Sequence, residues 1–131
     1  MFVFAILLMA AMYFFFASRG SKPTWKSKVQ AKLDSIKRRA NTSNLATLQQ
    51  LLIEADKLLD YTLQQRKVKG ETLGERLKNA NNLLDHPSYN NVWEAHKLRN
   101  RLVHEVDATA DARQLKSAVS GLERGILSLA K

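Results

Sequence analysis

The first 17 residues contain no charged side chain, and this run restricts the folds open to the chain more than any other feature. Residues Phe2 to Ala17 are almost all aliphatic or aromatic. A helix built from them is apolar on every side, whereas a surface helix of a soluble domain keeps a polar face. The run reaches the lower length limit of a membrane-spanning helix, roughly 17 residues. We therefore predict one transmembrane helix, an anchor over residues 1–18.

A cleaved signal peptide is the alternative interpretation of this run. Such a peptide has basic residues before its apolar stretch and small residues at a cleavage site after it. No Lys or Arg precedes the run, and Phe14, Phe15 and Phe16 occupy the region of the cleavage site. These observations favour an uncleaved anchor. Because the nearby positive charge follows the run, the positive-inside bias predicts a single-pass cell-membrane protein whose remaining part is cytoplasmic.

The positive charge of the chain is concentrated directly after the apolar run. The net charge is +9, and residues 18–41 contain eight Lys or Arg against one acid, Asp34. Residues 42–131 are close to balanced, with 13 bases and 11 acids. Residues 19–41 are therefore predicted to be a basic juxtamembrane linker and helix. Such a cluster attracts anionic lipid headgroups, and nucleic acid is the competing partner for a basic run.

The rest of the chain has the apolar spacing of helices. Thr24 and Asn44 are candidate N-caps, Thr72 to Glu75 has the T-x-x-E pattern of a capping box, and Ser88 is expected to start another helix. A long helix after Asn44 is expected to end near Gly70. No segment alternates apolar and polar residues as a strand would. The predicted fold class is all-α: an up-and-down bundle of four to five helices, with its main domain over residues 42–131, preceded by the transmembrane helix.

The apolar stripes of these helices define an expected core. Its members recur at helical spacing in four different segments: Leu52, Leu59, Leu77, Trp93, Leu102, Leu122 and Ile126.

The hexapeptide from Arg99 to His104 carries the candidate chemistry. Arg99 offers a planar fork suited to a phosphate, and His104 can act as acid or base near neutral pH. Asn100 and His104 are four residues apart and share a helix face. Arg99 lies about 140° from His104 around the helix axis, so a long side chain or a bend is needed to bring both groups to one cleft.

At these residues the chain resembles the HEPN superfamily, whose members are small helical bundles, often dimeric and in many cases RNases. Their signature is an arginine, frequently followed by a polar residue such as Asn, and then a histidine four to six residues on. The stretch from Arg99 to His104, with Asn100 after the arginine, fits the four-residue variant. The resemblance covers residues from about 45 to 130, mostly as a helical layout.

The resemblance implies metal-independent RNA cleavage at a cleft between two subunits of a homodimer. His104 would transfer the proton, Arg99 would stabilise charge on the phosphate, and Asn100 would position one of them. The alternative is a non-catalytic helical module that holds a protein partner or a nucleotide at the membrane, since many members of the superfamily resemble non-catalytic binding modules. His86 and His96 are expected to be surface or turn residues. The histidines lack metal-ligand spacing, so we expect no metal and no cofactor.

Overall fold

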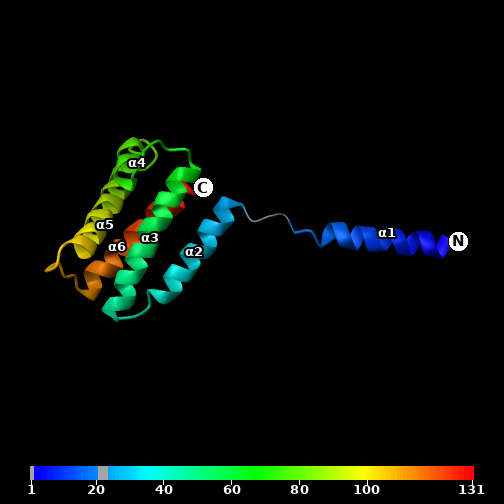
Figure 1. The fold of residues 1–131 in the computed structure, drawn as a ribbon, viewed down its shortest axis with the longest axis horizontal. Helices are drawn as coiled ribbons and strands as arrows, with labels where there is room; N and C mark the ends of the chain where they lie inside the picture. The colour runs from blue at the N-terminus through cyan, green and yellow to red at the C-terminus, as the bar shows by residue number, and fades with distance from the viewer. Residues whose placement is uncertain (1, 21–23) are drawn as a thin grey trace.

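The computed structural model describes residues 2–20 and 24–131, and these residues form six helices and no strand. The helices are α1 (Phe2–Ala17), α2 (Trp25–Arg39), α3 (Leu45–Gln65), α4 (Leu73–Asn79), α5 (His86–His104) and α6 (Ala112–Leu129). The prediction of an all-α helical bundle is confirmed. In Figure 1 the chain runs along α2, α3, α5 and α6 in alternating directions, and the short α4 lies in the connection between α3 and α5.

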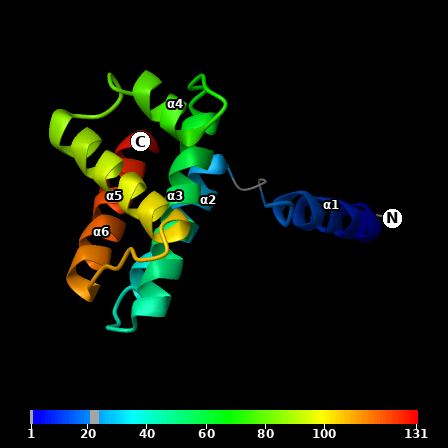
Figure 2. The same ribbon diagram turned by 60° about the vertical axis from the view of Figure 1, so that its left-hand side comes forward.

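The predicted transmembrane helix over residues 1–18 is not found. Helix α1 has 16 residues, which is about 24 Å of helix, against the roughly 30 Å of a bilayer's hydrocarbon core. Among the residues that the structure describes, no helix combines the length and the apolar character needed to cross a membrane. None of the residues of α1 is buried, and the helix lies apart from the bundle in Figures 1 and 2.

Local side chains determine where most helices begin. The predicted N-caps Thr24, Asn44 and Thr72 accept hydrogen bonds from backbone N–H groups three residues on. The predicted start at Ser88 is wrong by two residues. Asp85 caps α5 by accepting a hydrogen bond of 2.8 Å from the backbone N–H of Ser88. Pro87 fits the first turn of α5, where its missing N–H needs no partner.

Helix α3 ends at Gln65, several residues before the expected glycine cap. Lys67 adopts a left-handed conformation with φ of 60°, and the N–H of Val68 donates to the carbonyl of Leu63. This pattern is a Schellman closure, which commonly uses glycine at the left-handed position. Gly70 lies in the following turn, where its φ of 148° is an angle that residues with a side chain rarely adopt.

The core lies where α3 and α6 pack on each other, with α5 on α6 and α2 on α3. Of the seven expected core residues, five are at most 1% exposed, while Trp93 and Leu102 pack against the core and are only partly buried. The basic segment 19–41 also contributes to the core: α2 buries Val29, Leu33 and Ile36. Its lysines and arginines therefore occupy the outer side of a helix that belongs to the bundle.

Candidate functional site

All three residues of the predicted site lie on α5, but among the described residues no hydrogen bond or ion pair joins His104 to Arg99 or Asn100. Arg99 and Asn100 are half-buried on α5, whereas His104 is the last residue of that helix and is exposed. The helix ends there because Glu105 turns to an extended conformation, with φ of −102° and ψ of 124°. His104 thus lies at the end of α5, whereas Arg99 and Asn100 bond to side chains further inside the bundle.

Arg99 and Asn100 belong to a closed ring of four polar side chains that joins α5 to α3. Arg99 Nη1 donates to Asn100 Oδ1 at 3.1 Å, and Asn100 Nδ2 lies 3.3 Å from His96 Nε2. His96 Nδ1 lies 3.1 Å from both carboxylate oxygens of Asp56. Arg99 Nε closes the ring at 3.5 Å from Asp56 Oδ2.

The ring determines the role of each nitrogen. Because Asn100 uses its oxygen to accept from Arg99, its amide nitrogen is the donor to His96 Nε2. The His96 proton then resides on Nδ1, which donates to Asp56. The Asp56 side chain is only 5% exposed and the His96 side chain 12%, so these bonds form with little water present. Both ring nitrogens of His96 are occupied.

Arg99 is held less completely than the other members of the ring. Its side chain is 24% exposed, and its buried Nε forms an ion pair with Asp56 without the geometry of a hydrogen bond. The guanidinium is therefore the counter-ion of the buried Asp56 carboxylate, and a buried charge needs such a partner. Part of the guanidinium remains open to solvent.

A hollow of about 460 Å³ opens beside the ring. The four ring residues line it together with residues of α3 and of the start of α4, namely Lys57, Asp60, Thr72, Leu73 and Gly74. Asp60 is paired with Arg76 at 2.8 Å. His104 is not part of this lining. The hollow thus combines a histidine, an arginine and an amide, but the histidine is His96.

The expectation that His96 is a surface or turn residue is wrong. His96 lies on α5 one turn before Asn100, so the two share a helix face, and this i, i+4 spacing was the available signal. Asp56 gave a second signal, because it falls within the apolar stripe of α3 between Ala55 and Leu59. A carboxylate in such a stripe needs a cationic or hydrogen-bonding partner.

Metal chemistry has no ready site in the part of the chain that the structure describes. Within residues 2–20 and 24–131, no three or more His, Asp or Glu side chains are grouped so that they could hold a metal ion. Comparisons with protein-family models, with curated proteins and with solved structures found no match. The HEPN resemblance of residues 99–104 therefore stays a prediction.

Proposed function

We propose that this chain is a non-catalytic helical interaction module that helix α1 holds at a lipid membrane. The observation that carries the proposal is α1 itself: 16 uncharged residues, apolar on all sides, none of them buried. Apolar surface exposed to water costs about 25 cal/mol per Å², so a helix of this kind needs apolar surroundings. The basic residues that follow it favour the cytoplasmic leaflet, which is rich in anionic lipid.

The ring around Asp56 supports a non-catalytic bundle. Arg99 and Asn100 bond to their neighbours in the ring, and both nitrogens of His96 have partners. His96 therefore lacks the free nitrogen that a general base needs within reach of the proton that it removes. The ring instead ties α3 to α5 and gives the bundle a defined polar contact. We assign a protein as the partner of the bundle, and the HEPN resemblance favours a second copy of this chain.

The membrane part of the proposal is tested by one charge placed in α1. Leu8→Lys introduces an ammonium into the apolar helix, at a cost of about 2.5–3.5 kcal/mol in a membrane interior. We expect the partition of the full chain into phosphatidylcholine vesicles to fall by about 50-fold or more. Leu127→Lys is the matched control, because it changes an exposed leucine on α6 of the bundle. Equal vesicle binding by the two variants, or a wild type that stays in solution, would refute this role of α1.

Metal-independent RNA cleavage is the second candidate function. One observation favours it: Arg99 and Asn100 line an open hollow with part of the guanidinium exposed. His104 is exposed at the end of α5, where a second subunit of a dimer could approach it. If this function is present, Arg99→Ala and His104→Ala should each lower cleavage of mixed single-stranded RNA by roughly 100-fold, without additivity.

The cleavage assay uses the full chain in mild detergent, with and without a chelator. The chelator should change nothing, because no metal takes part in the proposed step. Melting curves of His104→Ala should match those of the wild type, since this side chain is exposed. Absence of cleavage by the wild type rejects the nuclease, and cleavage that survives both substitutions identifies a contaminant.

A further inference from the structure

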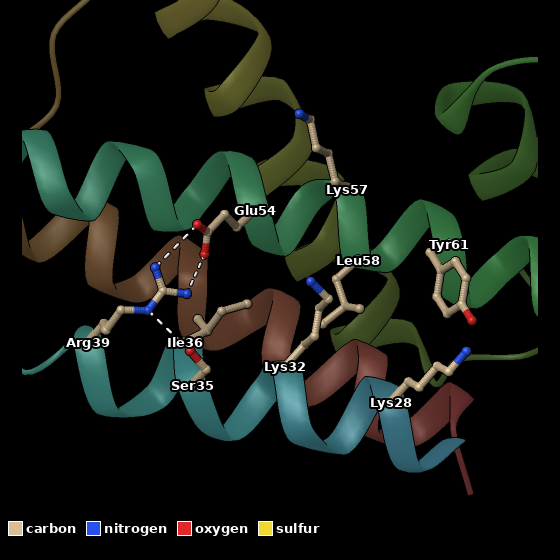
Figure 3. A pocket seen from close by; sticks show the side chains of 9 residues that line it. All are labelled: Lys28, Lys32, Ser35, Ile36, Arg39, Glu54, Lys57, Leu58 and Tyr61. Carbon is tan, nitrogen blue, oxygen red and sulfur yellow. Dashed lines mark hydrogen bonds and ion pairs between the residues drawn. The ribbon is translucent and has the colours of Figure 1, made fainter. Parts of the chain in front are cut away.

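A second hollow, of about 540 Å³, lies between α2 and α3 on the face that these two helices share. We call it the α2–α3 hollow. Figure 3 shows Lys28 and Lys32 extending from α2 toward α3, with Tyr61 of α3 beside Lys28. Ile36 and Leu58 line its apolar floor and are almost completely buried. The hollow thus has an apolar base with amines at its edge.

The charges in the α2–α3 hollow do not cancel. Glu54 accepts two hydrogen bonds from the guanidinium of Arg39, and this bonding holds the pKa of Glu54 below its ordinary value. Glu54 is therefore ionised at neutral pH and neutralises Arg39. Within the described part of the chain, no ion pair involves Lys28 or Lys32, and Lys32 acts on Glu54 only as a nearby charge that adds a small part to the lowering of its pKa. Lys57 also lines the hollow, but in Figure 3 its amine points away from α2, so Lys28 and Lys32 are the two ammonium groups left on the α2 side. An anion placed between them would relieve their mutual repulsion.

The position of the hollow along the chain indicates which anion it meets. Lys28 belongs to the first turn of α2, and only residues 18–24 separate α2 from α1. Seven residues reach at most about 25 Å when fully extended. If α1 is inserted in lipid, this short tether keeps the Lys28 end of the hollow near the headgroups and raises their effective concentration there. An anion of the membrane surface therefore has an advantage over an anion of the bulk solution.

We propose that the α2–α3 hollow binds the phosphate of an anionic lipid headgroup between Lys28 and Lys32. The proposal rests on the membrane role of α1 described above. Ammonium groups bind phosphate as compact point charges with several donors, and the Tyr61 hydroxyl offers a further donor. The apolar floor suits the glycerol portion of a lipid better than it suits a fully hydrated ion. The hollow would thereby orient the bundle on the membrane surface.

The test compares vesicles of phosphatidylcholine with vesicles that also contain phosphatidylglycerol, using the full chain. The wild type should bind to both through α1 and should prefer the anionic vesicles. Lys28→Gln with Lys32→Gln should reduce that preference by roughly 25-fold, since each lysine near a membrane surface contributes about fivefold. The control pair Lys37→Gln with Arg38→Gln removes the same charge from α2 outside the hollow. It should reduce the preference by clearly less.

Each alternative gives a different outcome. Equal losses for the two pairs would show diffuse attraction and overturn the proposed site. Equal binding of the wild type to both vesicles would also overturn it, while leaving the role of α1 intact; failure to bind either vesicle would remove both proposals. Lys28→Arg with Lys32→Arg should keep the preference, and thermal melting monitored by circular dichroism should show that all variants fold.

A second readout identifies the source of the phosphate. Lysine amines labelled by ¹³C-methylation give separate NMR signals, and those of Lys28 and Lys32 should shift when phosphatidylglycerol is added to nanodiscs that hold the full chain. Inorganic phosphate or single-stranded RNA at matched phosphate concentration should leave these two signals nearly unchanged. Equal shifts with either of these soluble anions would assign the hollow to that anion and overturn the lipid assignment.

Discussion

Helix α5 approaches α6 closely at Gly125, and this glycine supports a quantitative prediction. A Cβ atom added to Gly125 would lie 2.4 Å from Cγ1 of Val92, far inside the normal contact distance. A Cβ added to Gly121, about one turn earlier on α6, would meet Cβ of Asn91 at 3.4 Å, the near limit of ordinary contact. The two glycines are buried on one helix and therefore form a matched pair.

Opposing effects determine the outcome of alanine at each position. Replacing glycine by alanine inside a helix stabilises it by about 0.5–1 kcal/mol. At Gly121 this gain should remain, so Gly121→Ala should raise the free energy of unfolding by roughly 0.5 kcal/mol. At Gly125 the overpacking cost of about 1–3 kcal/mol should exceed the gain. Val92 is β-branched and rotates away with difficulty, so Gly125→Ala should be destabilising by about 1–2 kcal/mol.

Urea unfolding of the full chain in mild detergent measures both changes. The two tryptophans, Trp25 and Trp93, pack against the core and report unfolding by fluorescence. Val92→Ala removes the clashing methyl groups, so its combination with Gly125→Ala should cost at least about 1 kcal/mol less than the sum of the single changes. Equal stability of Gly121→Ala and Gly125→Ala, or an additive double variant, would refute the close approach of α5 and α6 at this point.

Three further predictions follow from single buried or partly buried side chains and use the same unfolding assay. Asp56→Ala removes the partner of His96 and Arg99 and should lower the free energy of unfolding by about 2–4 kcal/mol. A buried hydrogen bond to a charged group is lost, and Arg99 stays partly buried without its counter-ion. A loss below about 0.5 kcal/mol would contradict the ring. Burial raises the pKa of Glu123, so its ionised form opposes folding and stability should fall as pH rises from the unfolded-state pKa, about 4.3, through the raised folded-state pKa. Glu123→Gln should remove this fall, and an unchanged pH profile would show that Glu123 does not cause it. Leu59→Ala empties a fully buried site and should cost about 2–5 kcal/mol; a cost below about 0.5 kcal/mol would place Leu59 outside the core.

Local rules in the sequence determined the helices and most of the core. Thr24, Asn44 and Thr72 cap helices as expected, because N-capping depends on one side chain and the next three residues. The apolar stripes identified Leu52, Leu59 and the other fully buried residues, because the 3.6-residue period determines which side of a helix meets the core. The start of α5 was misplaced because a proline ends one helix and fits the first turn of the next equally well.

The candidate site depended on tertiary structure. The sequence pointed to Arg99 and Asn100, but Asp56, the ion-pair partner of Arg99, is more than 40 residues away on α3. No local rule states which helices pack together, and that packing decides which polar side chains meet. It joined Arg99 and His96 to Asp56 and left His104 exposed at the end of α5. Spacing along one helix determines which of its side chains share a face, whereas the helix that packs against that face is decided only when the bundle assembles.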